Sequence, residues 1–328
     1  MIEARGRFIT FTAPQGATHI IGDFTDDMDR PMPLGAGQSI TLEFGLGSLV
    51  EYCFLDVNGS RFADPDNASN GENPWWREYR SVALRGYTPH PLRQPLPDAP
   101  IGSSEVLTWD SQILAGKRRA YLHLPPNFEA SRQYPVFIVQ DGVAYRRTGK
   151  LGAVHDNLLH LGRINPCVFC FLEPQDRTLE YYFNSAYLEF LRTDVLPRLE
   201  QRLNISKLGL WGASLGGLAS LYAAMHAPET FGMVVTQSAA LQGQPNTVYK
   251  RGANDWLTAQ LGAMPALPLR ISADCGTLEW LLGTNRRFAA MLAQKHYPHQ
   301  YLERSSGHNW VTWRDGLAAH LEWHLGVL

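Results

Sequence analysis

Cysteine is scarce in this sequence: four cysteines in 328 residues are too few and too scattered for a disulfide framework. Two of them, Cys167 and Cys170, form a C-x-x-C pattern inside the apolar run CVFCFLEP. Residues three apart on a strand face opposite ways, and no second Cys or His pair follows at the spacing of a zinc site. We therefore expect buried thiols and no bound metal.

Neither sign of charge is in excess, and long apolar runs are absent. The 29 Lys and Arg residues against 31 Asp and Glu residues give a net charge of -2, which offers no attraction to nucleic acid or to an acidic membrane surface. No run approaches the roughly 20 apolar residues of a membrane span. The opening MIEARGRFIT lacks the basic and apolar segments of a signal peptide. These absences predict a cytoplasmic protein with no membrane or nucleic-acid partner.

The length and the 45% content of hydrophobic residues predict about two domains with a sizeable core. Residues 1–88 hold short strand-like runs separated by turns rich in Gly, Pro, Asn and Asp, a pattern typical of a β-sandwich. Residues 89–102 are rich in proline, which cannot continue a helix or a central strand, so this segment is predicted to be an extended linker. The expected strands cover residues 6–13, 18–24, 39–46, 48–57 and 79–86.

Residues 103–328 alternate between strand-like and helix-like runs. Such alternation predicts an α/β fold with a mostly parallel sheet covered by helices on both faces. Ligands of such sheets bind at the carboxyl ends of the strands, so residues that follow strands are the candidates for chemistry. The expected strands cover 118–125, 134–140, 167–173, 208–214, 233–239, 267–273 and 299–305, and the expected helices cover 185–203, 215–228, 284–296 and 313–325.

Gly212-Ala213-Ser214-Leu215-Gly216 fits the pattern G-x-S-x-G. A strand-like run precedes it and a helix-like run follows it, which is the setting in which a serine stands on a tight, strained turn. Small flanking residues let the backbone make that turn, and the following helix directs N–H groups toward developing negative charge. We therefore predict that Ser214 is the nucleophile of an α/β-hydrolase. A chance match to the pattern is the alternative.

A serine hydroxyl needs a histidine to take its proton and a carboxylate to orient the imidazole. In this fold the three follow in the order Ser, Asp or Glu, His. His308 lies between the last expected strand and the last expected helix, next to a glycine, and is predicted to be the base. The acid should follow the strand at 267–273, where both Asp274 and Glu279 are available. Each has a structural alternative, because the first could bond turn amides and the second could stabilise a helix N-terminus.

The oxyanion of an ester intermediate needs N–H donors. One is predicted to be the backbone N–H of Leu215, directly after the nucleophile. The other should lie in the turn after an earlier strand, and the N–H of Val143, after Asp141-Gly142, is our candidate. An ordinary Asp-Gly turn explains that segment equally well.

An ordered series of motifs in the second part of the chain resembles the enterochelin esterase family, within the wider esterase D group that also holds feruloyl esterases. The matching pieces include YPVFIVQDG, WGASLGGLASLYAAMHAPETFG, TQSA, CGTLE and GHNWVTWRDGL. The resemblance implies a triad acid at Glu279 rather than Asp274, because the feruloyl esterases carry their acid in a Cys-Gly-Thr-x-Asp stretch. No cofactor and no metal are expected. The substrate-binding candidates that the resemblance suggests are Arg177, Glu180, Asn184 and Arg286.

The first part of the chain resembles the N-terminal β-sandwich of the enterochelin esterases, itself similar to carbohydrate-binding domains. The pieces IIGDFTDDMDRPMPL and VEYCFLDVNGSRFADPDN carry this resemblance. Family members more typically show a tryptophan after GDF, where this chain has acidic residues, and that departure puts sugar binding in doubt. Because the proposed catalytic residues all follow the linker, we expect residues 1 to about 95 to shape substrate choice rather than to do chemistry.

Together the motifs predict a serine carboxyl-ester hydrolase that forms an acyl-serine intermediate on a small-molecule ester. A siderophore ester of the enterochelin type is the first candidate substrate, and a feruloyl or acetyl sugar ester is the alternative. Acyl transfer to an alcohol uses the same residues and stays open, as does a binding protein that keeps the fold without catalysis. The sequence does not fix the oligomeric state.

Overall fold

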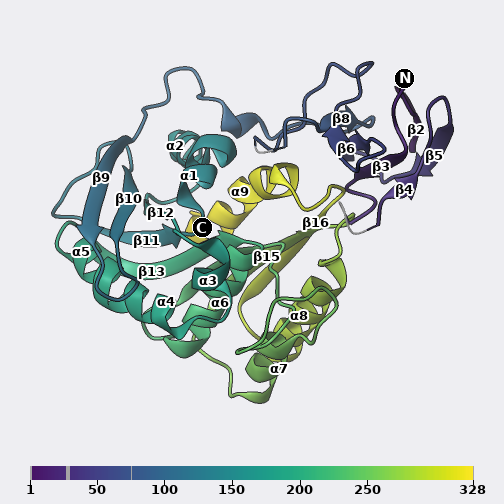
Figure 1. The fold of residues 1–328 in the computed structure, drawn as a ribbon. Helices are drawn as coiled ribbons and strands as arrows, with labels where there is room; N and C mark the ends of the chain where they lie inside the picture. The colour runs from purple at the N-terminus through teal and green to yellow at the C-terminus, as the bar shows by residue number, and fades with distance from the viewer. Residues whose placement is uncertain (1, 27–29, 75, 328) are drawn as a thin grey trace. The chain divides into compact units, whose positions relative to one another are not determined.

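The N-terminal part of the chain forms two small antiparallel sheets in the computed structural model, which describes residues 2–26, 30–74 and 76–327 (Figure 1). One sheet has the strand order β1-β2-β5, and the other has the order β4-β3-β6-β7 with β8 paired to β6. The strands are β1 (Ile2–Arg5), β2 (Phe8–Thr12), β3 (His19–Gly22), β4 (Met32–Pro33), β5 (Ser39–Glu43), β6 (Leu49–Leu55), β7 (Arg61–Phe62) and β8 (Arg80–Ala83).

The two sheets share one hydrophobic core. Ile9 and Phe11 of β2 are buried and alternate with more exposed residues, as a strand with one covered face requires. The strand β6 is buried along its whole length because both of its faces are covered. Tyr52 on one face joins the core of Ile9 and Phe11, and Cys53 on the other face packs with Tyr79. The predicted β-sandwich is confirmed.

The contacts of the chain divide it into two compact units. The first unit holds residues 1–91, 275–282 and 303–315, and the second holds residues 92–274, 283–302 and 316–328. The boundary after residue 91 lies inside the segment predicted to be a linker. Two short segments from the C-terminal part of the chain therefore belong with the N-terminal sandwich, a feature that no local sequence pattern indicates.

An eight-stranded sheet has the order β16-β15-β14-β13-β11-β12-β10-β9. Strands β11 to β15 pair in parallel, and β9 and β10 add an antiparallel edge. This is the mostly parallel α/β-hydrolase sheet that the sequence predicts, with β9 as an additional strand. The strands are β9 (Ser103–Asp110), β10 (Lys117–Leu124), β11 (Gln133–Val139), β12 (Val168–Leu172), β13 (Asn204–Ala213), β14 (Met233–Gln237), β15 (Arg270–Gly276) and β16 (His299–Arg304).

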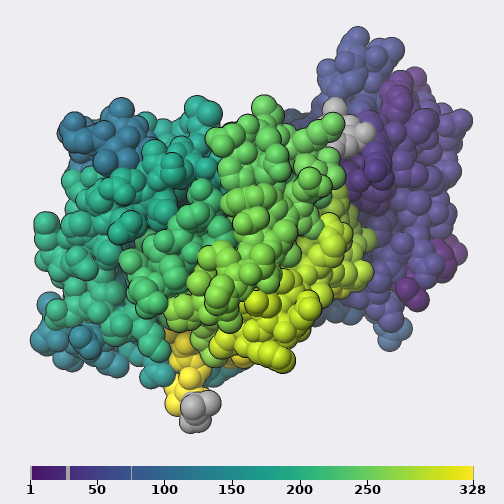
Figure 2. All heavy atoms as spheres, turned by 90° about the horizontal axis from the view of Figure 1, so that it is seen from below, coloured from purple at the N-terminus to yellow at the C-terminus, as the bar shows by residue number. Residues whose placement is uncertain are grey.

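Helices cover both faces of this sheet, with α2 on one side and α4 and α6 on the other (Figure 1). Phe169 of β12 contacts His155 of α2, whereas the next residue, Cys170, joins a core with Leu218 of α6. Figure 2 shows successive segments of the second unit side by side, from teal through green to yellow-green. The helices are α1 (Gly142–Ala144), α2 (Leu151–His160), α3 (Arg177–Tyr181), α4 (Ser185–Glu189), α5 (Leu196–Glu200), α6 (Leu215–His226), α7 (Trp256–Ala263), α8 (Leu282–Gln294) and α9 (Trp310–Leu325).

The four predicted helices are present, one of them in an altered form. The predicted helix at 185–203 consists of α4, the π-helical segment η4 (Phe190–Val195) and α5 in succession. Helix α2 is not among the predictions. It begins after Lys150, which has left-handed backbone angles and no side-chain cap, so the usual sequence signals of a helix start are missing there.

The proline-rich segment is fastened to helix α2. The Asn157 side-chain amide donates to the carbonyl oxygens of Leu92 and Gln94, at 2.7 Å in both cases. Asp156 Oδ2 accepts the Gly102 N–H at 2.7 Å. The side chains of Asp156 and Asn157 are buried. Their hydrogen bonds tether the segment predicted to be a linker to helix α2 of the second unit.

The cysteines and the helices bear on two predictions made from the sequence. Cys167 and Cys170 are buried thiols, as expected, and burial raises the pKa of Cys170 to about 12. Among the described residues, no helix has the length and apolar character needed to cross a membrane.

Candidate active site

Ser214 stands on a sharp turn between β13 and α6. Its backbone angles are φ 55° and ψ -122°, a conformation that non-glycine residues rarely adopt and that persists only where the surroundings enforce it. The Ser214 N–H donates to the Gln237 carbonyl at 2.9 Å, and the Ser214 carbonyl accepts the Ala240 N–H at 3.0 Å. The end of β14 and the residues after it therefore hold the turn.

Glycine is required on both sides of this turn. A Cβ atom on Gly212 would lie 2.3 Å from the carbonyl carbon of Gly216, and one on Gly217 would lie 2.7 Å from Thr236 Oγ1. The close approach lets α6 begin directly behind β13. The N–H groups of its first turn, including that of Leu215, have no acceptor within the helix, so they are the donors that an oxyanion would use.

The second predicted oxyanion donor, Val143, lies in α1, directly after β11. Asp141 before it has left-handed backbone angles, with φ 52°, and a Cβ atom on Gly142 would lie 2.3 Å from the carbonyl carbon of Phe171. In this structure the Val143 N–H donates to a carboxylate oxygen of Glu173, whose pKa is raised by burial. The oxyanion role of Val143 stays a prediction, and it now has a condition: Glu173 must release or share that N–H.

Arg177 connects the turn after β11 to the nucleophile turn. Its Nε lies 2.9 Å from Asp141 Oδ1, and its Nη2 lies 3.0 Å from Asp141 Oδ2. The same Nη2 donates to the Ala213 carbonyl at 3.1 Å, one residue before Ser214. The Asp141 N–H in turn donates to Tyr181 Oη at 3.0 Å. These contacts support a positioning role for Arg177, which the sequence suggested as a substrate-binding residue.

The other substrate-binding candidates differ in their surroundings. Glu180 is buried, and its Oε1 accepts from Arg118 Nη1 at 2.7 Å. Asn184 caps helix α4, where its Oδ1 accepts the Ala186 N–H at 2.8 Å. Arg286 is exposed on α8. Substrate binding by these three residues stays a prediction, and the contacts of Glu180 and Asn184 give both a structural task.

Glu279 and His308 form a hydrogen-bonded pair in the first unit. Glu279 Oε2 lies 2.5 Å from His308 Nδ1, and Glu279 Oε1 accepts the Gly276 N–H at 2.6 Å. The Glu279 side chain is fully buried, whereas 14% of the His308 side chain is exposed. The rings of Trp280 and Trp313 lie 4.5 Å and 5.2 Å from the imidazole, between centroids. The imidazole is therefore held by a fixed carboxylate and by two aromatic rings that the sequence analysis did not single out.

Asp274, the alternative acid, holds a different histidine. Its Oδ2 lies 2.9 Å from His320 Nε2 and accepts from Gln237 Nε2 at 2.9 Å. The other ring nitrogen of His320, Nδ1, lies 2.5 Å from Ser272 Oγ. All four side chains are fully buried. The structure thus pairs Glu279 with His308 and places Asp274 in a buried network with His320.

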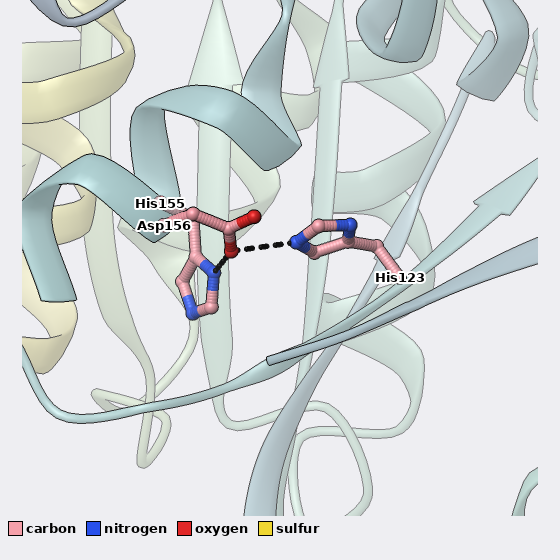
Figure 3. A group of neighbouring side chains, drawn as sticks. All are labelled: His123, His155 and Asp156. Carbon is pink, nitrogen blue, oxygen red and sulfur yellow. Dashed lines mark hydrogen bonds and ion pairs between the residues drawn. The ribbon is translucent and has the colours of Figure 1, made fainter. Parts of the chain in front are cut away.

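A third group of histidines gathers between β10 and α2. Figure 3 shows the rings of His123 and His155 pointing toward the same carboxylate, that of Asp156. His123 Nε2 and His155 Nδ1 lie 2.9 Å and 3.0 Å from Asp156 Oδ1. The residue types are those of a metal site. No local sequence pattern indicates this group, because the strand and the helix that carry it are separated in the chain.

The hydrogen bonds of His155 argue against a metal in this group. His155 Nε2 accepts the Cys167 N–H at 3.2 Å, so a neutral ring carries its proton on Nδ1, the atom that faces Asp156. Burial lowers the pKa of His155, which favours the neutral ring. A metal on Nδ1 would move that proton to Nε2, against the Cys167 N–H. The group therefore fits a hydrogen-bonded core network and does not fit a metal.

Comparison with known proteins shows the family of this chain. The family model described as "Putative esterase" matches residues 111–324. An iron(III) enterobactin esterase of Dickeya dadantii (strain 3937) is 28% identical over 238 residues, which cover 67% of this chain and 54% of that protein. An iron(III) enterobactin esterase of Escherichia coli (strain K12) is 26% identical over 271 residues, which cover 78% of this chain and 65% of that protein. The chain thus spans between about half and two thirds of the length of these relatives.

Solved structures share the fold. The enterobactin esterase of Shigella flexneri, determined in the presence of enterobactin, has a TM-score of 0.77 and 21% identity, covering 98% of this chain and 94% of that chain. The ferric enterobactin esterase of Salmonella typhimurium has a TM-score of 0.76 and 19% identity, covering 96% and 93%. A ferulic acid esterase of Anaeromyces mucronatus, in complex with ferulic acid, has a TM-score of 0.58 and 17% identity, covering 72% and 95%.

Proposed function

This chain belongs to the Putative esterase family, and from that premise we propose that it is a serine carboxyl-ester hydrolase with Ser214 as its nucleophile. The observation that carries the proposal is the strained turn of Ser214 at the carboxyl end of β13, because a polar residue held in such a conformation between a strand and a helix is typical of a nucleophile elbow. The pair of His308 and Glu279 supplies a base and the carboxylate that orients it.

In the proposed first step, Ser214 Oγ attacks the ester carbonyl carbon while its proton passes to His308 Nε2. The Nδ1–H of His308 stays bonded to Glu279, which stabilises the imidazolium. The oxyanion accepts the Leu215 N–H and, once Glu173 yields it, the Val143 N–H. Collapse of the intermediate breaks the bond to the alcohol, which leaves with the proton from His308. Water then attacks the acyl-serine by the same steps and releases the carboxylic acid.

As substrate we propose a siderophore ester of the enterobactin type. The names of the relatives support this class, and a ferric catecholate is strongly anionic, so it should meet cationic side chains. Arg146 and Lys150, which follow β11, are the cationic candidates; the pocket of about 200 Å³ that both line in the second unit is not lined by Ser214. The guanidinium of Arg177, by contrast, is occupied by Asp141. A cytoplasmic location, where an imported siderophore would be cleaved, stays part of this proposal.

A substrate panel tests both parts of the proposal. Ferric enterobactin, iron-free enterobactin, methyl ferulate, an acetylated sugar and p-nitrophenyl acetate would be compared by kcat/KM with the wild-type enzyme and with Ser214→Ala. We expect the highest value for the trilactone, and a loss of about 10⁶-fold in Ser214→Ala, because a triad nucleophile acts as one unit with its base. A preference for methyl ferulate or the acetylated sugar would change the substrate class.

Covalent labelling tests the nucleophile independently of the substrate. A fluorophosphonate probe should label Ser214 in the wild-type protein, and mass spectrometry of Ser214→Ala should find no labelled serine. Labelling that persists in Ser214→Ala would transfer the role to another residue. Addition of an acceptor alcohol distinguishes the remaining alternative, because an acyltransferase would form a new ester in place of the free acid.

A further inference from the structure

The N-terminal sandwich anchors an acidic residue next to the segment that carries His308. Asp23 follows β3, and two hydrogen bonds tie it to Glu51 of β6. The Asp23 N–H donates to the Glu51 carbonyl at 3.0 Å, and Asp23 Oδ2 accepts the Glu51 N–H at 2.8 Å. Because β6 is fully buried between neighbouring strands, one carboxylate oxygen of Asp23 is fixed to the centre of the sandwich.

The other carboxylate oxygen of Asp23 holds the residues on both sides of His308. Asp23 Oδ1 accepts from Asn309 Nδ2 at 3.0 Å. Asn309 is 1% exposed, and its own Oδ1 accepts the Val311 N–H at 3.0 Å at the start of α9. Gly307 packs on the same carboxylate so closely that a Cβ atom there would lie 2.0 Å from Asp23 Oδ1. A single side chain thus contacts both chain neighbours of the proposed base.

Further contacts join the N-terminal sandwich to the segments of the proposed acid and base. Ser48 Oγ lies 2.6 Å from Ser305 Oγ. Leu278, the residue before Glu279, packs against the core of the sandwich. The Leu278 N–H also donates to the Ser306 carbonyl at 3.2 Å, so the two segments are bonded to each other. The sandwich therefore supports the acid and the base together.

We propose that Asp23 is a positioning residue for His308, so that the N-terminal sandwich takes part in building the catalytic machinery. The inference rests on the proposed function, in which His308 is the base. A displacement of about 1 Å at a catalytic group can reduce the rate about 100-fold, and the Asp23–Asn309 contact limits such a displacement. The expectation that residues 1 to about 95 shape substrate choice rather than do chemistry stays a prediction, and this proposal adds a positioning role to it.

An exchange of the two hydrogen-bonding partners tests the contact. In Asp23→Asn, the new amide can accept from Glu51 N–H only by turning its NH₂ group toward the NH₂ group of Asn309. In Asn309→Asp, two acidic side chains face each other, and they repel each other unless they share a proton. In the double variant, the amide at position 23 donates to the carboxylate at position 309, and the hydrogen bond is restored with its direction reversed. We expect each single variant to lower kcat by about 10-fold to 100-fold, and the double variant to recover most of the loss.

The measurement is kcat for p-nitrophenyl acetate across pH, together with near-UV circular dichroism and a thermal melt. A misplaced base should also change the pH profile of kcat/KM, which a merely less stable protein would not do. The matched control is Asp64→Asn in the same unit, because the buried Asp64 carboxylate accepts from Tyr52 Oη at 2.6 Å. This variant should lower the melting temperature and leave kcat and the pH profile unchanged.

The outcomes separate this inference from the proposed function. Low activity of both single variants with recovery in the double variant supports it, provided that His308→Gln is inactive. Single variants with wild-type kcat and pH profile, alongside an inactive His308→Gln, would overturn the positioning role and leave the proposed function standing. A double variant no better than its worse parent would overturn it as well. An active His308→Gln enzyme would remove the proposed function, and this inference with it.

Discussion

Two histidine–carboxylate pairs, Glu279 with His308 and Asp274 with His320, are built from the same elements. Asp274 lies in β15 and Glu279 follows it, whereas His320 lies in α9 and His308 precedes it. In the first pair the imidazole is partly exposed and is bonded to carboxylate through Nδ1. In the second pair both members are fully buried, and the two ring nitrogens of His320 are occupied by Asp274 and Ser272. Both pairs match the order of a triad in the sequence, so order alone does not distinguish them.

The difference teaches that burial separates the pair proposed to be catalytic from the pair of His320. The base of this mechanism must take a proton from the serine and give it to the leaving alcohol, and a fully enclosed imidazole with two satisfied nitrogens cannot do so. His320 instead bonds to Asp274 and Ser272 of β15, so that polar groups of β15 and α9 are hydrogen-bonded. A buried carboxylate without such a partner would destabilise the fold. The His123 side chain is 10% exposed, close to the value of His308, so burial does not classify the pair of His123 and Asp156.

The largest expected contrast compares matched substitutions of the two histidines. His308→Gln should lower kcat by about 10⁶-fold, because base and nucleophile act as one unit. His320→Gln should keep kcat near the wild-type value while it lowers the melting temperature, since it disturbs a buried network. The measurement is hydrolysis of p-nitrophenyl acetate beside a thermal melt. An inactive but stable His320→Gln enzyme would reverse our reading of the two pairs.

The two carboxylates provide the next contrast. Glu279→Gln should reduce kcat on the order of 10⁴-fold, because the imidazole loses its orientation and the stabilisation of its charge. Asp274→Asn should cost far less activity and more stability, since Asp274 Oδ2 serves His320 and Gln237 in the core. Steady-state kinetics with urea unfolding of both variants would decide. If Asp274→Asn loses more activity than Glu279→Gln, the acid is Asp274.

The sequence predicts those features of the fold and the site that depend on neighbouring residues, and it does not predict those that depend on residues far apart in the chain. The turn at Ser214 is local, because the glycines, the strand before it and the helix after it lie within a few residues. The choice between Asp274 and Glu279 is not local, because it depends on which histidine packs beside each carboxylate. The resemblance to feruloyl esterases pointed to Glu279, but periodicity and spacing left both residues open.

Features joined only by tertiary contact had no signal in the chain. Asp23 and Asn309 are 286 positions apart, and no pattern at either residue indicates the other. The tether of the proline-rich segment to Asn157 is of the same kind, since prolines predict an extended segment but not what it binds. The donation of the Val143 N–H to Glu173 likewise depends on the neighbouring strand β12.

The pair of His123 and Asp156 should reveal itself in acid. Burial alone would raise the pKa of Asp156, but hydrogen bonds from His123 and His155 lower it to about 2, below the ordinary aspartate value of 3.8. The native state therefore binds this proton less tightly than the unfolded state does. The stabilisation is complete above the unfolded pKa and is lost as the pH falls through about 2.

Asp156→Asn should accordingly lower the free energy of unfolding by roughly 2 kcal/mol near neutral pH, with the gap to wild type closing in acid. Urea unfolding of both proteins at several pH values down to about 3 would measure the gap. A gap that stays constant over this range would show that the charge of Asp156 does not contribute, and that only its shape matters.

The smallest expected effect concerns the buried hydroxyl of Ser272, which is bonded to the ring nitrogen of His320 that Asp274 does not contact. Ser272→Ala removes the hydrogen bond to His320 Nδ1, and a single neutral hydrogen bond contributes about 1 kcal/mol to stability. Gln300 Nε2 lies 3.5 Å from Ser272 Oγ, so its amide can move toward the vacated nitrogen and keep the loss small. Activity should be unchanged, because His320 has no part in the proposed chemistry. Urea unfolding and kcat for p-nitrophenyl acetate would be measured together, with Ser272→Thr as the variant that retains the hydroxyl. A fall in kcat for Ser272→Ala that Ser272→Thr restores would show that the buried network reaches the catalytic residues, and the separation of the two pairs would then fail.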